Sequence, residues 1–377
     1  MLFSLLSTFW RSTFSRGASG VRYSLTRRKT RGPLIALALL ATASTAHAQW
    51  QPSETHSLAS FRGLSVAPDG TVWVGGPGGT VLRSTDAGAT WRTETVPDTH
   101  SFDFRGVAAI DARTAFVMVA ATDTARIYHT SDGGATWTLQ YTDQRPGVFL
   151  DGIGCWNALR CLAAGDPIDG HFVIVATTDG GAHWRPLPAA RAPAAMTGEA
   201  AFAASNSSVV AGAGGRAWIA TGGGAIARVW RSADYGATWT VASTPVAAGT
   251  SSAGIFSLAF CDVQRGVAVG GDYAKPAAPG AHAAVTTDGG ATWVVADTAH
   301  ETPYLSAAAC VASAGNRIVA VGPVATAVSP DGGLTWDVTD DTGFNAVAVS
   351  RGTVIAVGAD GTTARAAIPA FAPPRHE

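Results

Sequence analysis

Short runs of apolar residues recur along the chain and are separated by polar turns rich in glycine. A period begins with a run of small and aliphatic residues, such as RGLSVA at 62–67 or NAVAVS at 345–350. After a turn, a second apolar run ends in glycine, as in TVWVGG at 71–76 or TVIAVG at 353–358. Runs this short, bounded by turn residues, predict β-strands rather than helices.

A third run in six of these periods leads into an eight-residue phrase, Ser/Thr-x-Asp-x-Gly-x-x-Trp, whose Trp begins a fourth run. The phrase occupies 84–91, 130–137, 177–184, 232–239, 286–293 and 329–336, and its aspartates are Asp86, Asp132, Asp179, Asp234, Asp288 and Asp331. We expect each Asp to accept backbone N–H groups two residues on, within a tight turn that the Gly permits. The Trp offers a flat face to bury between sheets and an indole N–H for a backbone carbonyl. We therefore interpret the phrase as structural, since one carboxylate per turn is too few oxygens for calcium.

The spacing of the aspartates, between 43 and 55 residues, is the repeat length of a β-propeller blade. The last period, at 344–366, supplies three strands and no fourth, whereas Trp50 stands one repeat length before Trp91 without three strands of its own. We therefore predict an all-β fold in which 49–370 form one seven-bladed β-propeller. Its blades are four-stranded and antiparallel, its ring is closed by the N-terminal strand, and a Pro-rich tail follows at 371–377.

Residues 1–48 have the pattern of a secretory signal. Basic residues precede the apolar run LIALALLATASTA, and Ala46 and Ala48 are the small residues that a signal peptidase requires. Cleavage after Ala48 would leave no transmembrane segment, so we expect a periplasmic or secreted protein. The motif TRRKT at 26–30 leaves a twin-arginine signal open beside the ordinary secretory route.

Removal of the signal makes the chain acidic. Seven of the 26 basic residues lie in 1–48 and no acidic residue does, so the remainder has 19 basic residues against 27 acidic ones. Such a surface disfavours nucleic acid as a partner. The nine histidines are scattered and form no metal-binding motif. We expect a monomer with no metal and no cofactor.

Four cysteines remain in the exported part, and none form a C-x-x-C pair. Cys155 and Cys161 flank a short polar turn, so we predict that a disulfide clamps this hairpin. The sequence leaves the state of Cys261 and Cys310 open.

The residue that precedes the small residue of each first run suggests a functional site. First strands line the central channel of a propeller, so these residues should form one ring near its mouth: Arg62, Arg105, Asp151, Glu199, Phe256, Leu305 and Asn345, which precede Gly63, Gly106, Gly152, Ala200, Ser257, Ser306 and Ala346. Second strands return to the same face and bring Asp166, Asp272 and Tyr273 there. The predicted binding site consists of Arg62, Arg105, Asp151, Asp166, Glu199, Asp272, Tyr273 and Asn345. The alternative is a set of ion pairs, such as Arg62–Glu199, that keep the blades in register.

The eight-residue phrase is that of the Asp-box, or bacterial neuraminidase repeat. Together with FRG at 61–63 and 104–106, GDP at 165–167, GEAAFAAS at 198–205, GIFSLAF at 254–260 and GGDY at 270–273, it makes the chain resemble the exported bacterial branch of the photosystem II stability/assembly-factor-like family. The resemblance implies a propeller that binds a protein client through basic residues. The acidic mature chain does not fit that mode of client binding.

We therefore predict a module that binds or assembles a protein or glycan partner at its axial face, without assigned catalytic residues. The alternative is a sialidase-like or other glycoside hydrolase that uses Asp151 and Glu199 as its carboxylate pair. The sialidase form of that reading lacks a third arginine in the ring and a Tyr beside Glu199.

Overall fold

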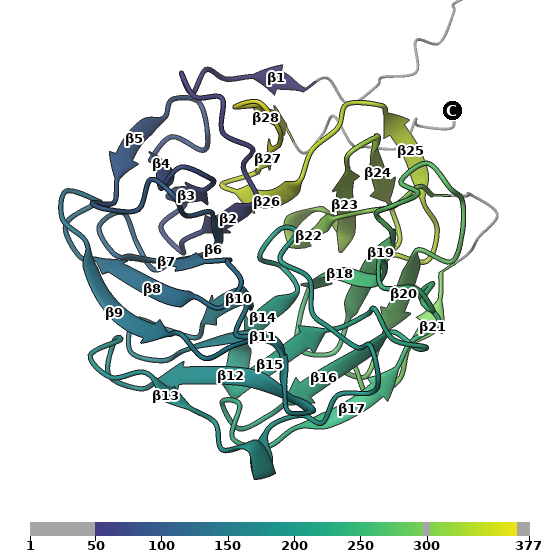
Figure 1. Ribbon diagram of the computed structural model, residues 1–377. Coiled ribbons are helices and arrows are strands. Elements are labelled where there is room, and N and C mark those ends of the chain that lie inside the picture. The colour runs from purple at the N-terminus through teal and green to yellow at the C-terminus, as the bar shows by residue number, and fades with distance from the viewer. Residues whose placement is uncertain (1–49, 297–301, 368–377) are drawn as a thin grey trace, which may run out of the picture. The chain divides into compact units, whose positions relative to one another are not determined.

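The protein is described here by a computed structural model that places residues 50–296 and 302–367 (Figure 1). These residues form seven four-stranded antiparallel sheets, which confirms the predicted seven-bladed β-propeller. Three single-turn 3₁₀ helices, Ala189–Arg191, Ala213–Gly215 and Ala312–Ala314, interrupt the β-structure. Within the placed residues, no helix is long and apolar enough to cross a membrane. The predicted signal segment and the Pro-rich tail lie outside the described residues.

Six blades take their four strands from consecutive segments of the chain. The first three blades comprise β2 (Gly63–Val66), β3 (Val72–Gly75), β4 (Thr80–Ser84) and β5 (Arg92–Thr95); β6 (Phe104–Ala109), β7 (Ala115–Val119), β8 (Ala125–Thr130) and β9 (Thr138–Asp143); and β10 (Leu150–Cys155), β11 (Cys161–Ile168), β12 (His171–Thr177) and β13 (Arg185–Pro186). The next three comprise β14 (Val209–Gly212), β15 (Arg216–Ala220), β16 (Arg228–Ser232) and β17 (Thr240–Ser243); β18 (Ala253–Phe260), β19 (Gly266–Asp272), β20 (Ala283–Thr286) and β21 (Val294–Val295); and β22 (Ala307–Val311), β23 (Arg317–Gly322), β24 (Ala325–Ser329) and β25 (Asp337–Asp340).

The seventh blade combines both ends of the described chain. It contains β26 (Ala346–Ser350), β27 (Thr353–Val357) and β28 (Thr363–Ala367), and its outermost strand is β1 (Gln51–Pro52). Gln51 pairs with Arg365 in this sheet. The ring of Trp50 lies 4.8 Å from that of Phe344, and its indole N–H donates to the hydroxyl of Thr326 at 3.3 Å. This pairing covers part of the edge of β28, which would otherwise present unpaired backbone groups.

The inner strands contact one another in cyclic order, β2, β6, β10, β14, β18, β22, β26 and again β2. The second strand of a blade is largely buried, throughout in β3 and β7 and at all but its first residue in β23, whereas the outer strands β5 and β17 are mostly exposed. A strand that is apolar on both faces can only be buried if a sheet covers each face. Each blade therefore depends on its two neighbours.

The repeated phrase forms a hydrogen-bonded turn between the third and fourth strands. In the second blade, the Asp132 carboxylate accepts the backbone N–H of Thr136 at 2.9 Å, four residues on rather than the two that we expected. The Thr130 hydroxyl donates to Asp132 and accepts the N–H of Gly134, both at 2.9 Å. Hydrogen bonds from the Thr136 hydroxyl and N–H lower the pKa of Asp132 to about 2. The carboxylate bonds to an N–H four residues on because the Thr130 hydroxyl already accepts the N–H groups of Asp132 and Gly134.

The Trp that ends each phrase packs against the preceding blade. Trp137 stands edge-on to Trp73 with ring centroids 6.1 Å apart, and Trp184 stands edge-on to Phe116 at 5.9 Å. Two of the six indoles donate to a glycine carbonyl of their own turn, those of Trp239 and Trp336. Three have no acceptor among the described residues, those of Trp137, Trp184 and Trp293, so the expected carbonyl bond is not general. Burial of the ring, rather than this hydrogen bond, is the common feature.

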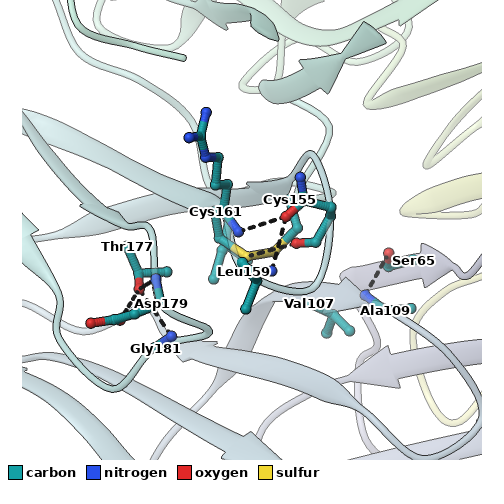
Figure 2. The surroundings of a disulfide bond; sticks show 12 residues. Ser65, Val107, Ala109, Cys155, Leu159, Cys161, Thr177, Asp179 and Gly181 are labelled. Carbon is teal, nitrogen blue, oxygen red and sulfur yellow. Dashed lines mark hydrogen bonds between the residues drawn. A yellow bond between two sulfur atoms is a disulfide. The ribbon is translucent and has the colours of Figure 1, made fainter. Parts of the chain in front are cut away.

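The described residues contain two disulfides, one within a blade and one between blades. Cys155 and Cys161 are bonded across the β10–β11 hairpin (Figure 2). The carbonyl of Leu159 in this hairpin accepts the N–H of Gly180, which belongs to the phrase turn of the same blade. The second disulfide, Cys261–Cys310, links the fifth blade to β22 of the sixth. The sequence left that bond open because its cysteines are 49 residues apart.

The phrase turn can be tested at Thr130, which is buried. The change Thr130→Val keeps the side-chain shape but leaves the buried N–H of Gly134 without an acceptor. We expect it to lower the free energy of unfolding by about 1–3 kcal/mol, measured by urea denaturation. The matched control is Thr136→Val, whose exposed hydroxyl water can replace. Equal losses in the two variants would contradict this account of the turn.

The seventh blade can be tested at Trp50, which is half-buried against the core that joins the first, sixth and seventh blades. We expect Trp50→Ala to lower the free energy of unfolding by roughly 2 kcal/mol, about half the usual loss for a fully buried Trp. Leu58, in the same N-terminal segment, is 87% exposed, and Leu58→Ala should leave the melting temperature unchanged. A melting temperature of Trp50→Ala equal to that of the parent would show that the N-terminal segment does not stabilise the ring.

Candidate binding site at the axial cavity

A cavity of about 680 Å³ lies among the inner strands at one face of the ring. Six residues of the predicted site line it: Arg62, Arg105, Asp151, Asp166, Tyr273 and Asn345. Two other predicted members, Glu199 and Asp272, do not. The volume is in the range of sites for small molecules or for one or two residues of a peptide.

Local irregularities in the sheets occur at several residues that line the cavity. The pairing of β6 with β7 shifts by one residue at Arg105, and that of β10 with β11 shifts at Asp151. The same shift occurs at Phe256 in β18 and at Asp166 where β11 meets β12. An extra residue in one strand is left out of the ladder, and its side chain can be aimed away from the regular alternation. The four bulged residues all line the cavity.

Glycines at the ends of second strands let the two inner strands of a blade come close together. A Cβ atom on Gly165 would collide with the carbonyl oxygen of Phe149, and one on Gly270 would collide with that of Gly254. These glycines directly precede Asp166 and Gly271 at the face that holds the cavity. In these two blades the glycine near the end of the second run is therefore needed for close approach of the backbone.

The cationic side of the cavity consists of Arg62 and Arg105. The Arg105 Nε donates to Asp103 at 2.6 Å, so Arg105 forms an ion pair with a carboxylate two residues before it. The guanidinium of Arg62 has no ion pair or hydrogen bond with a described residue. Burial, and then repulsion from Arg105, lower the pKa of Arg62. Arg62 is thus a partly buried cation whose charge the described part of the protein does not balance by direct contact.

The acidic side consists of Asp151 and Asp166. Asp151 is only 1% exposed, and its Oδ2 atom has no hydrogen-bond partner among the described residues. Burial and the neighbouring Asp166 raise the pKa of Asp151 well above its usual value, against the opposing effect of Arg105. Burial also raises the pKa of Asp166, whose Oδ1 accepts the N–H of Ala201 at 3.0 Å. The two carboxyl groups therefore retain a proton more strongly than isolated aspartates do.

Aromatic rings form the third side of the cavity. Phe202 and Phe256 are stacked with centroids 4.0 Å apart, and Tyr273 stands edge-on to both. Tyr304 stands edge-on to Phe256 at 4.8 Å. Burial raises the pKa of Tyr304, so its hydroxyl stays protonated. Sequence reasoning missed Phe202 and Tyr304, although Phe202 lies in GEAAFAAS and Tyr304 directly precedes the ring residue Leu305.

The segment 198–208 crosses the centre of the ring and forms the floor of the cavity. The Asn206 amide donates to the carbonyls of Val107 and Ile153, at 2.8 and 3.2 Å, and accepts the N–H of Ile153 at 2.9 Å. On the opposite side, the Ser205 hydroxyl donates to the carbonyl of Ser306 at 2.8 Å. The inner strand of the fourth blade is β14, which follows this segment, so our alignment of Ala200 with the first strands was wrong. A run of small residues here fills the axis instead of forming a strand.

Glu199 is held outside the cavity by a buried ion pair with Arg228, whose Nε lies 2.9 Å from its carboxylate. The Thr221 hydroxyl and the Met196 N–H also donate to Glu199, at 2.6 and 2.8 Å. Its carboxylate is fully satisfied, so neither the Arg62–Glu199 pair nor an Asp151–Glu199 catalytic pair is assembled. The sequence could not reveal this because Arg228 is 29 residues away along the chain.

Asp272 and Asn345 have local structural contacts. The Asp272 carboxylate accepts the N–H of Ala274 at 3.0 Å, and a hydrogen bond with Ser252 lowers its pKa. The amide of Asn345 lines the cavity, yet it donates to the carbonyl of Phe61 at 2.9 Å and so joins the seventh blade to the first.

The buried Asp151 predicts a pH dependence of stability. Its pKa is raised in the folded protein above the ordinary 3.8, so the folded state retains this proton to higher pH than the unfolded chain does. Its contribution to the free energy of unfolding therefore falls as the pH rises above about 3.8 towards the folded pKa. We expect Asp151→Asn, which keeps the neutral shape, to gain melting temperature relative to the parent as the pH is raised from 4 to 8. A difference that stays constant over this range would refute the prediction, and the control is Asp337→Asn at an exposed position of β25.

No protein-family model and no curated protein matches this chain. Solved structures match its fold. Two structures of YCF48, one described as bound to D1 peptide and one from Cyanidioschyzon merolae, each align with a TM-score of 0.60 and 16% identity, over 86% and 84% of this chain and 99% and 98% of theirs.

A GH74 xyloglucanase from Xanthomonas campestris aligns with a TM-score of 0.60 and 15% identity, over 86% of this chain. A GH74 enzyme from Niastella koreensis aligns with a TM-score of 0.56 and 17% identity, over 82% of this chain. This chain spans 55% and 43% of those two enzymes. The protein is therefore similar in fold to YCF48 propellers and to GH74 propellers, and at these identities the likeness concerns the fold alone.

Proposed function

We propose that this chain is an exported binding module that holds a peptide segment of a protein partner in its axial cavity. In this proposal an anionic group of the peptide lies on Arg62, and an apolar side chain lies on the aromatic wall of Phe202, Phe256 and Tyr273. The export signal, the Asp-box turns and the likeness to exported assembly-factor-like proteins belong to the same proposal.

The observation that carries the proposal is the unbalanced charge of Arg62. Desolvation of the partly buried Arg62 guanidinium is offset only in part by the more distant Asp103. An anionic group of a ligand could offset it further, since charge-assisted hydrogen bonds to a carboxylate are among the strongest that proteins form. Arg105 has its own partner in Asp103 and so does not compete for that anion. The ion pair that the sequence suggested for Arg62 is not formed, because Glu199 is bound to Arg228, and Asp103, which acts on Arg62 at longer range, is bound to Arg105.

The wall opposite the arginines favours a peptide over a bare anion. Stacked and edge-on aromatic rings offer a large apolar surface at little entropic cost, as binding hot spots commonly do. Tyr273 is 54% exposed, so its ring is accessible from solvent. The YCF48 structure described as bound to D1 peptide supports a peptide as the kind of partner that such a propeller can take.

A second candidate function is hydrolysis of a glycan. Two observations favour it: the adjacent carboxyl groups of Asp151 and Asp166, both with raised pKa, and the fold likeness to GH74 enzymes. A glycosidase needs one carboxyl group that stays protonated and one that is ionised. The pair Asp151–Asp166 replaces Asp151–Glu199 in this alternative.

The binding proposal is tested by Arg62→Gln, which removes the charge and keeps a polar side chain. In a fluorescence-anisotropy screen of peptides that contain an acidic group and an aromatic residue, we expect peptides that bind the parent to lose roughly 10- to 100-fold in affinity to the variant. The melting temperature should not fall, because no described contact is lost. The matched control is Arg113→Gln on the surface, which should bind as the parent does.

Peptide binding that is equal in the parent and Arg62→Gln would overturn the proposal. The hydrolase alternative is judged on the same proteins with xyloglucan and aryl glycosides. Turnover that disappears in Asp166→Asn would establish that alternative in place of the binding module.

A further inference from the structure

The charges of the axial cavity are arranged by blade. Arg62 and Arg105 belong to the first and second blades, and Asp151 and Asp166 belong to the third. The aromatic rings come from the fifth and sixth blades and from the floor segment 198–208. The cavity therefore presents a cationic, an acidic and an aromatic sector to one occupant.

The cationic and acidic sectors do not neutralise each other by contact. Arg105 pairs with Asp103, which leaves one free positive charge at Arg62. Within the described residues, Asp151 and Asp166 make no salt bridge with a basic side chain, and the buried Oδ2 of Asp151 has no hydrogen-bond partner. Repulsion between the two neighbouring carboxyl groups opposes ionisation of both, so that the pair carries about one negative charge when one of them is protonated. One uncompensated charge of each sign thus remains on different walls of the cavity.

We propose that the occupant of the cavity is zwitterionic: its carboxylate lies on Arg62, its primary ammonium lies on the Asp151–Asp166 pair, and its large apolar side chain lies on the aromatic wall. This chemistry is that of an unblocked α-amino acid unit. Two sources can supply it, a free aromatic amino acid or a short peptide with both ends free. The inference rests on the proposed function of the cavity and names the class of ligand that it selects.

The requirement for both charges follows from the cost of leaving either unmatched. A ligand with a carboxylate alone would leave the open Oδ2 of Asp151 without a donor, and Asp166 with only the N–H of Ala201. A ligand with an ammonium alone would leave Arg62 desolvated and without an anion. Sites that contain buried polar groups reject analogues that cannot pair with them far more strongly than apolar pockets reject a missing methylene.

The test is isothermal titration calorimetry of the mature protein with four probes: phenylalanine, the dipeptide of two phenylalanines, N-acetylphenylalanine and phenylalanine amide. We expect phenylalanine or the dipeptide to bind, and the better of the two identifies the source. Each blocked probe should bind at least about 10-fold more weakly, since each lacks one charge-assisted hydrogen bond.

Two variants test which wall of the cavity binds the carboxylate of the ligand and which binds its ammonium group. Arg62→Gln should abolish the preference for phenylalanine over its amide, and Asp166→Asn should abolish the preference for phenylalanine over its N-acetyl form. Asp272→Asn is the matched control, because Asp272 occupies the equivalent strand end in the fifth blade outside the cavity; it should bind as the parent does. Its melting temperature and those of the two variants are measured to confirm folding.

Equal affinity for phenylalanine and its N-acetyl form would overturn the zwitterion inference. If that binding still depended on Arg62, the proposed function would survive without it. The inference would also fall if no probe bound to a folded parent protein. Loss of the proposed function itself would require, in addition, that no acidic peptide binds through Arg62.

Discussion

Burial of the second strand of every blade is the constraint on which the rest of the molecule depends. Strands such as β3 and β7 are apolar on both faces, so a lone blade would expose one apolar face on each side. The phrase Trp of each blade packs on the blade before it, and the inner strands contact one another around the full circle. Stability therefore arises between blades, in the manner of other repeat architectures, and the seventh blade must be completed by β1.

Closing seven inner strands into a circle leaves space at the axis, and this protein fills part of that space with its own chain. Asn206 and Ser205 bond to inner strands on opposite sides of the ring. The axis is therefore a cavity with a floor rather than an open channel. This arrangement explains why the side chains above the floor are buried enough for their pKa values to shift, since a water-filled channel would screen them.

The backbone around the cavity is tightly constrained, but some of its charged side chains have no direct partner among the described residues. Backbone bulges at Arg105, Asp151 and Asp166 aim these side chains at one volume, and glycines at the strand ends allow the close approach that the bulges need. Glu199, which lies outside the cavity, is paired with Arg228. Arg62 and the Asp151–Asp166 pair have no such partner although they lie on walls of the same cavity, and a common ligand would explain both.

The sequence by itself determined the repeat architecture, because apolar alternation, turn chemistry and the Trp of each phrase are local features with a fixed period. It also placed Arg62, Arg105, Asp151 and Asp166 near one another, since strand order in a propeller maps sequence position onto place around the ring. Tertiary structure alone decided which of the predicted residues are free to act. The segment 198–208 precedes the first strand of the fourth blade and forms the floor of the cavity instead of a strand. Glu199 is bound to Arg228, which is distant along the chain, and therefore does not line the cavity. Such a pairing joins residues that are far apart along the chain, and no local pattern of the sequence encodes its geometry.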